Sequence, residues 1–240
     1  MIKNITLTGA DDLNEPLDLV EICDKYPNAE FGILISKNKS GPRYPTEDWI
    51  LELFNVWKKA TNLNLSLHVC GKYVRDICNG NWSFFENSIL KETFKMFKRV
   101  QLNFSPYVDS INLDKFSNGL KIKELENKQI IFQLKKIDSL IYSSLKDKFN
   151  VVPLFDLSGG RGILPTEWPK STAYTGYAGG LNPNNVKESC AKIFSVAEGN
   201  FWIDAETGLR TKNEKCDFFD INKVNLFLER VLECSNLVGQ

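Results

Sequence analysis

Apolar residues of this chain gather in eight short segments, and the stretches between them show helical spacing. The segments are residues 5–8, 31–36, 65–70, 100–105, 129–135, 151–156, 174–178 and 201–204. Among the intervening stretches, residues 48–60 place apolar side chains three or four positions apart behind a candidate Thr46 cap, and residues 84–98 and 220–234 show the same spacing. Strands that alternate with helices predict parallel strands joined by βα units.

Eight such strands in 240 residues predict a single (β/α)8 TIM barrel domain over residues 1–240, because this fold typically takes about 250 residues. An open, doubly wound sheet is the alternative. We find no repeat, linker or low-complexity segment that divides the chain. A hydrophobic content of 42% and a charged content of 25% are typical of a globular domain with a large core.

The charge balance and the cysteines limit the partners that we expect. The 30 basic and 30 acidic residues cancel, which argues against a nucleic-acid partner. No apolar run approaches the ~20 residues of a membrane helix, and the chain starts directly with a strand rather than a signal peptide. Six cysteines without a C-x-x-C pair and a single histidine argue against a metal site. We therefore expect a cytoplasmic protein without cofactor; a homodimer is compatible with the sequence, which leaves the oligomeric state open.

Alternation within the strands predicts the lining of the barrel. Side chains two positions apart share a face of a strand. The polar faces contain Thr6, Thr8, Ser66, His68, Cys70, Gln101, Asn103, Ser105, Gln133, Lys135, Asp156 and Asp204. Because the apolar faces must meet the helices, we expect the polar faces to point into the barrel. An internally paired polar network with water is one explanation. A polar ligand that enters at the C-terminal ends of the strands is the better one, since the polar residues cluster there.

The most informative motif is Tyr-Ala-Gly-Gly-Leu-Asn-Pro-Asn-Asn-Val at residues 177–186. Gly179 and Gly180 let backbone N–H groups approach a ligand without a Cβ in the way. A helix that begins near Pro183 would direct its positive end to the same place. This arrangement is typical of a phosphate site in a β/α barrel, and Thr207 and Gly208, after the eighth strand, would complete it.

Two further loops carry residues suited to anions. Ser158, Gly159, Gly160 and Arg161 follow the sixth strand and form a rim able to close over an anion. Arg43 stands between two prolines in residues 40–45, where it either clamps a carboxylate or phosphate or remains an exposed arginine.

His68, the single histidine, is a candidate for catalysis or ligand contact. A lone histidine is more often a satisfied core residue, but His68 lies on a polar face near a strand end, two residues before Cys70. Asp11, just past the first strand, is a further candidate.

These loops resemble those of phosphoribosylanthranilate isomerase, a β/α-barrel enzyme of tryptophan biosynthesis. Residues 178–186 are close to that family's phosphate motif, and residues 204–208 resemble its last strand and loop. The resemblance runs loosely along the whole chain. It implies that Asp156 is the general acid and that Arg43 meets the carboxylate of the substrate's anthranilate group.

The chain departs from that family at the base. Thr8 stands where the family has a cysteine that takes a proton from the sugar, and a threonine hydroxyl cannot do this near neutral pH. Residues 103–106 replace the family's Gln-x-His-Gly, while residues 68–71 carry a similar His-x-x-Gly one strand earlier. Either the base has moved to His68 or Cys70, or the reaction has changed, or the barrel only binds.

The sequence therefore predicts an isomerase-like enzyme, or a related lyase or hydrolase, that acts on a phosphorylated ribose or nucleotide-like metabolite. Asp156 would be the acid, and His68 or Cys70 would take over from Thr8 as the base. The alternative is a non-catalytic barrel that binds or sequesters such a metabolite, and a third interpretation is a structural scaffold. The predicted ligand-binding residues are Asp11, Arg43, Asn103, Gln133, Ser158, Gly159, Gly160, Arg161, Gly179, Gly180, Asp204, Thr207 and Gly208.

Overall fold

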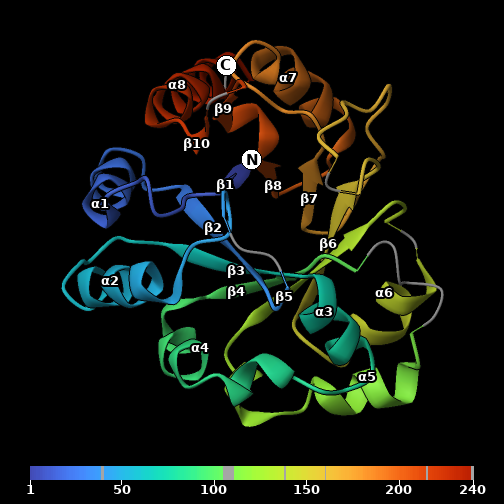
Figure 1. The fold of residues 1–240 in the computed structure, drawn as a ribbon. Coiled ribbons are helices and arrows are strands. Elements are labelled where there is room, and N and C mark those ends of the chain that lie inside the picture. The colour runs from blue at the N-terminus through green and yellow to red at the C-terminus, as the bar shows by residue number, and fades with distance from the viewer. Residues whose placement is uncertain (39–40, 105–110, 138, 160, 215, 239–240) are drawn as a thin grey trace.

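Eight parallel strands form a closed barrel surrounded by helices (Figure 1). The computed structural model describes the chain except residues 39–40, 105–110, 138, 160, 215 and 239–240 and the side chains of 235–238. The strands are β1 (Ile2–Thr8), β2 (Ala29–Ser36), β3 (Leu65–Cys70), β4 (Arg99–Leu102), β5 (Gln129–Leu134), β6 (Val151–Asp156), β7 (Thr175–Ala178) and β8 (Phe201–Ala205). Because β1 pairs in parallel with both β2 and β8, the predicted closed barrel is confirmed and the open sheet is wrong.

The helices lie outside the barrel (Figure 1). They are α1 (Pro16–Lys25), α2 (Glu47–Trp57), α3 (Gly71–Cys78), α4 (Ser88–Thr93), α5 (Leu113–Gly119), α6 (Leu140–Leu145), α7 (Val186–Val196) and α8 (Ile221–Val238), with short 3₁₀ turns η1 (Ser83–Glu86), η2 (Phe94–Met96), η4 (Lys123–Leu125) and η5 (Thr207–Leu209). The predicted cap is confirmed, since the Thr46 hydroxyl accepts a bond from the Trp49 N–H at 3.3 Å.

The single helix predicted over residues 84–98 is wrong. The segment is divided into η1, α4 and η2. The Asn87 side chain accepts a hydrogen bond from the Leu90 N–H at 3.0 Å and so caps a new helix, because an asparagine oxygen satisfies an N–H group that has no partner within the first turn.

Several predicted boundaries also need correction. The helix expected near Pro183 begins at Val186, after a turn in which Asn182 and Asn185 side chains bond the backbone. The helix expected from residue 220 begins one residue later, because the Asp220 carboxylate accepts a bond from the Asn222 N–H and lies just before it. A hairpin of β9 (Arg210–Lys212) and β10 (Asp217–Phe219) was not predicted.

Two members of the predicted polar lining are placed differently. Lys135 is exposed, because β5 ends at Leu134 and an unpaired ammonium group is costly to bury. The fourth strand ends at Leu102, and Ser105 lies outside the described residues.

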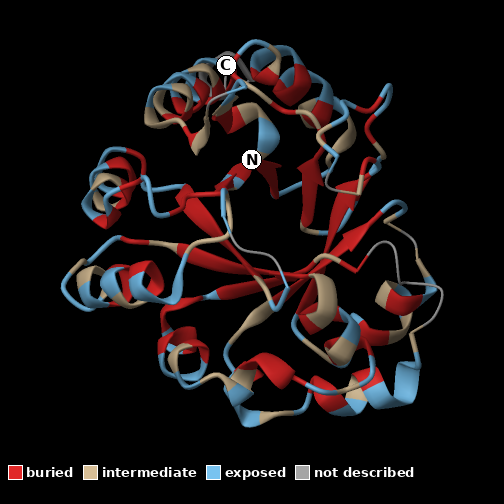
Figure 2. Ribbon diagram, viewed as in Figure 1, coloured by how far each residue is buried: buried red, intermediate tan, exposed pale blue. Residues whose placement is uncertain are grey.

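The strands are buried throughout most of their length, and the helices are buried on part of their surface (Figure 2). The main core is formed by apolar side chains of both. Leu65, Leu67 and Val69 of β3 are buried there, as the alternation predicts. Inside the barrel, Thr6, Thr8, Ser66, His68, Gln101 and Gln133 are buried polar residues. They share the interior with an apolar group consisting of Ile131, Val152, Leu154, Ala178 and Trp202. The barrel is thus half polar and half apolar inside.

A buried ion pair in the barrel interior joins two strands that are distant in sequence. Arg99 Nη1 donates to Glu30 Oε1 at 3.0 Å, and the Thr6 hydroxyl donates to the same carboxylate oxygen at 2.9 Å. The Arg99 guanidinium lies 4.3 Å from the centre of the Trp202 ring. Sequence alternation missed this layer because the predicted strands began at residues 31 and 100, directly after Glu30 and Arg99, whereas β2 begins at Ala29 and β4 at Arg99.

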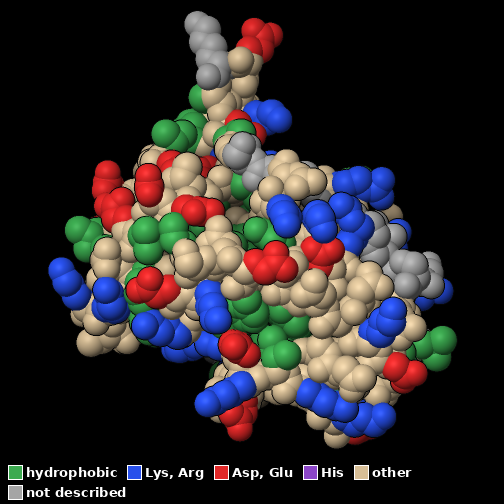
Figure 3. Space-filling model, turned by 60° about the horizontal axis from the view of Figure 1, so that its bottom comes forward, with side chains coloured by type: hydrophobic (Ala, Val, Ile, Leu, Met, Phe, Trp, Pro, Cys, Tyr) green, Lys and Arg blue, Asp and Glu red, His purple; other side chains and the backbone are tan. Residues whose placement is uncertain are grey.

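The outer surface carries both signs of charge. On the face in Figure 3, Lys and Arg side chains are interspersed with Asp and Glu side chains. Within the described residues, we find no helix with the length and apolar character needed to cross a bilayer.

Candidate functional site

The C-terminal mouth of the barrel contains two adjoining compartments. The first, which we call the glycine compartment, has a volume of about 40 Å³ and is lined by the ends of β4 to β8 and the loops that follow β6, β7 and β8. The second, which we call the arginine compartment, has a volume of about 570 Å³ and lies over β2 and β3. Asn103, Gln133 and Glu206 line both. The mouth therefore suits a ligand with a compact end and a bulky end.

Backbone donors converge on the glycine compartment. Gly179 and Gly180 follow β7, while Thr207 and Gly208 lie in η5, directly after β8. In the described part of the chain, the N–H groups of Gly180, Leu181, Thr207 and Gly208 donate to no protein acceptor. Thr207 is exposed and Gly180 and Gly208 are half-buried, so these N–H groups can be reached by a ligand, and such groups are suited to an anion.

The glycines of these loops are needed for close packing. Gly180 has a φ of +62°, and a Cβ there would lie 2.4 Å from the Leu164 nitrogen. At Gly208 a Cβ would lie 2.1 Å from the Leu181 carbonyl oxygen. A side chain at Gly180 would push against the loop after β6, and one at Gly208 against the loop after β7, so either would disturb the compartment.

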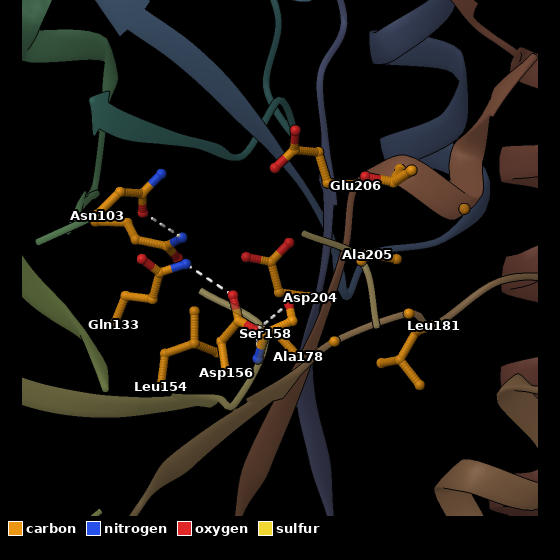
Figure 4. A pocket seen from close by; sticks show the side chains of 16 residues that line it. Asn103, Gln133, Leu154, Asp156, Ser158, Ala178, Leu181, Asp204, Ala205 and Glu206 are labelled. Atoms are coloured by element: carbon orange, nitrogen blue, oxygen red, sulfur yellow. Dashed lines mark hydrogen bonds between the residues drawn. The ribbon is translucent and has the colours of Figure 1, made fainter. Parts of the chain in front are cut away.

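Asp156, at the end of β6, is held by three donors. Gln133 Nε2 donates to its Oδ2 at 2.8 Å, and the Ser158 N–H and hydroxyl donate to its Oδ1 at 3.0 and 2.7 Å. Figure 4 shows the bond from Gln133, with both side chains at the wall of the compartment. The sequence placed these three residues in one site, and the structure brings them into direct contact.

Asp204, at the end of β8, lies in a different environment. Its Oδ1 accepts a bond from the Thr8 hydroxyl at 2.9 Å, and no Lys or Arg among the described residues forms an ion pair with it. Burial raises the pKa of Asp204 to about 8; the negative charges of Glu206, Asp156 and Glu30 act in the same direction, and the Thr8 bond opposes them. Figure 4 shows Asp156, Asp204 and Glu206 projecting into the same space.

The carboxylates beside the arginine compartment are paired with cations. Arg43, whose φ is +79°, forms an ion pair with Glu206. Arg210 is buried and bonds Asp11 at 2.8 Å and Asp217 at 2.6 Å. Burial raises the pKa of Glu206 although Arg43 opposes the shift, whereas the bond and charge of Arg210 outweigh burial and lower the pKa of Asp217.

The two candidate bases differ in access. Cys70 lines the arginine compartment, accepts a bond from Asn103 Nδ2 at 3.1 Å and interacts with the Tyr44 hydroxyl. His68 lies deeper, lines neither compartment, and its Nε2 has no partner among the described residues. Burial and the nearby Arg99 charge lower the pKa of His68 to about 3, so this ring is neutral and a weak base near pH 7.

Most of the predicted site residues lie at the mouth. The glycine compartment is lined by Asn103, Gln133, Asp156, Ser158, Gly179, Gly180, Asp204, Thr207 and Gly208. The arginine compartment adds Arg43, Cys70 and Gly159. Thr8, Asp11, His68 and Arg161 line neither, since Arg161 turns back to bond the Ser158 carbonyl oxygen at 2.9 Å. Gly160 lies outside the described residues.

Three participants were not among the predicted site residues. Glu206 bridges the two compartments, and Arg210 and Asp217 fix the arginine side. Glu206 stands in the predicted loop after β8, so its position was a usable signal. The β9–β10 hairpin that positions Arg210 and Asp217 has only three residues in each strand, which is too short for a clear alternation. Among the described residues, no group of His, Cys, Asp and Glu is arranged to hold a metal ion.

The fold and the position of this site define a β/α barrel with its site at the C-terminal face. Among solved structures, the chain is similar to the phosphoribosylanthranilate isomerase from Thermus thermophilus, with a TM-score of 0.56 and 12% identity over 96% of this chain and 98% of that chain. It is also similar to the N-(5'-phosphoribosyl)anthranilate isomerase from Pyrococcus furiosus, with a TM-score of 0.51 and 16% identity over 96% and 98%. The predicted resemblance is thus confirmed at the level of the fold. No protein-family model matches the sequence, and no curated protein does.

Proposed function

We propose that this barrel is an isomerase-like enzyme that acts on a phosphorylated ribose or nucleotide-like metabolite. One observation carries the proposal: backbone N–H groups that have no acceptor among the described residues share the glycine compartment with Asp156 and Asp204. The amides would hold the phosphate, and the carboxyl groups would lie beside the sugar atoms next to it.

The chemistry that this arrangement supports is a relocation of protons within one substrate. Such a reaction needs one group that removes a proton and one that supplies it. Asp156 is one of these two groups, because three donors fix its orientation at the wall of the compartment. No cofactor takes part in this scheme. The arginine compartment, at about 570 Å³, would take the part of the substrate beyond the sugar, since binding pockets for small molecules measure about 300–1,000 Å³.

The second candidate function is binding without turnover. It is favoured by Thr8, whose hydroxyl donates to Asp204, and by His68, which is enclosed and has a pKa of about 3. Neither supplies a base at the position where the resemblance implies one. The same residues would then capture a phosphorylated metabolite and release it unchanged.

Native mass spectrometry of the protein purified from cells tests the ligand class. We expect a co-purified metabolite whose mass and fragmentation show a phosphoribosyl group. Incubation with phosphoribosylanthranilate then separates the two functions: product formation supports the enzyme, while a complex recovered intact after long incubation supports the binder. A protein that binds neither phosphoribosylanthranilate nor inorganic phosphate would contradict both.

A cytoplasmic location and a homodimer complete the proposal. Cell fractionation tests the first, and analytical ultracentrifugation across a range of concentrations tests the second.

A further inference from the structure

The carboxyl group of Asp204 has an environment unlike that of the other acidic side chains at the mouth. Its Oδ1 meets one donor, the Thr8 hydroxyl, and its side chain is buried. Glu206 has Arg43 as its partner, and Asp156 accepts two N–H bonds, one on each oxygen. Among the described residues, Asp204 has neither an N–H donor nor a cation.

Strand register places Asp204 and Asp156 on opposite sides of one residue. Ala178 of β7 pairs with Asp156 of β6 and with Asp204 of β8. All three line the glycine compartment, and Figure 4 shows the two carboxyl groups flanking the same space above Ala178. A substrate bound in this compartment would therefore lie beside both carboxyl groups.

We propose that Asp204 carries a proton at neutral pH and is the proton donor of this site, while Asp156 is the proton acceptor. This inference rests on the proposed function. It gives Asp156 the opposite role from the one that the family resemblance implies. Thr8 becomes a positioning residue: its bond to Oδ1 orients the carboxyl group and leaves Oδ2 toward the compartment.

The charged groups around Asp204 agree with a bound proton. Glu206 on its own strand's loop, Asp156 across β7 and Glu30 across β1 are all acidic and raise its pKa, in addition to burial. Arg43 and Arg99 are bonded to Glu206 and Glu30, and Arg210, which also acts on Glu206, is bonded to Asp11 and Asp217. A phosphate in the same compartment would add negative charge, which further favours the protonated form of Asp204.

The proposed isomerisation needs no oxidant or reductant, because it only moves protons. A C–H bond of the substrate breaks as an O–H bond forms on Asp156, and the O–H bond of Asp204 breaks as its proton moves to a second substrate atom. The electron pair stays within the substrate, which isomerises. Exchange with water then returns the proton from Asp156 to Asp204.

Sulfate binding tests the bound proton independently of turnover, since sulfate does not titrate between pH 6 and 9. We expect the affinity of the wild-type protein for sulfate, measured by calorimetry, to fall about tenfold as Asp204 loses its proton near pH 8, because a second carboxylate beside Asp156 then repels the anion. Asp204→Asn, which resembles the protonated form, should bind sulfate equally at all pH values. Thr8→Val should move the pH at which sulfate affinity falls to a higher value, because it removes the hydrogen bond that lowers the pKa of Asp204. A flat wild-type profile overturns the proposal.

Turnover of phosphoribosylanthranilate tests the donor role. Asp204→Asn should lower turnover about 10²–10⁴-fold while sulfate affinity at pH 7 is kept. The exposed Asp147, at the opposite end of the barrel, offers a control, and Asp147→Asn should change neither quantity. If Asp204→Asn turns over normally, or if Cys70→Ala removes the activity instead, the inference is wrong and the proposed function stands. If the wild type shows the sulfate profile but turns over no substrate, the isomerase function fails and the donor role fails with it.

Discussion

The sequence places residues suited to anions in both compartments of the mouth. The structure shows that the compartments differ in which of these groups are available to a ligand. On the arginine side, Arg43 and Arg210 are paired with carboxylates of the same chain. On the glycine side, the N–H groups of Gly180 and Gly208 have no acceptor among the described residues. The two arginines thus form ion pairs within the protein, whereas the backbone N–H groups of the glycine side can bind a ligand. An arginine in a loop indicates an anion site only when its own neighbours leave it free.

The largest expected effect is at Gly180. Gly180→Asp should abolish binding of inorganic phosphate, since it adds bulk at a φ of +62° and negative charge beside the donors. Calorimetry measures the loss. Gly199→Asp is the matched control, because Gly199 also has a positive φ but has open space around it. Unchanged phosphate affinity in Gly180→Asp would show that the glycine side does not bind the anion.

Asp156→Asn tests whether the glycine side performs chemistry. Turnover of phosphoribosylanthranilate should fall about 10²–10⁴-fold, with much less change in affinity, because the amide keeps the shape but cannot exchange a proton in the same way. Steady-state kinetics with Asp147→Asn as control measures the effect. A change in affinity alone would support the binding function.

The pH dependence of stability should have opposite signs on the two sides. The raised pKa of Asp204 means that the folded state holds a proton that the unfolded state releases above about pH 4. Its stabilising contribution is therefore lost as pH rises toward about 8. The lowered pKa of Asp217 means that its contribution is lost as pH falls.

Urea unfolding at fixed pH values measures this contrast. Relative to Asp204→Asn, the free energy of unfolding of the wild type should fall by on the order of a few kcal/mol between pH 5 and pH 8. Relative to Asp217→Asn, it should lose stability on acidification. Differences that stay constant with pH would show that neither carboxyl group is perturbed.

The smallest effect is expected at the Arg43–Glu206 pair. Arg43→Ala and Glu206→Gln should each lower the free energy of unfolding by about 1–2 kcal/mol, and the double variant by little more, because both side chains are about one quarter exposed, at 24%. Phosphate affinity of Arg43→Ala should stay within about twofold. A loss of more than about 1.5 kcal/mol in phosphate affinity would show that Arg43 contacts the anion, as the sequence suggested.

The sequence by itself determined the barrel and much of its mouth. Alternation identified the inward faces of β1 and β3, because the direction of a side chain from a strand depends on its position alone. Paired glycines located the loop after β7, because a positive φ and close backbone approach are requirements of the local chain. These local signals are present although the chain is only 12% and 16% identical to the similar solved structures.

Only the tertiary structure decided which charges are available. Arg43 and Glu206 are 163 residues apart in sequence and Arg210 and Asp11 are 199 apart, so no local pattern relates them. The Glu30–Arg99 pair and the single bond between Thr8 and Asp204 depend in the same way on the closure of the barrel. Ion pairing, burial and the resulting pKa of a carboxyl group are properties of the assembled surroundings. For that reason most of the residues that line the mouth could be predicted from the sequence, while their protonation and their partners could not.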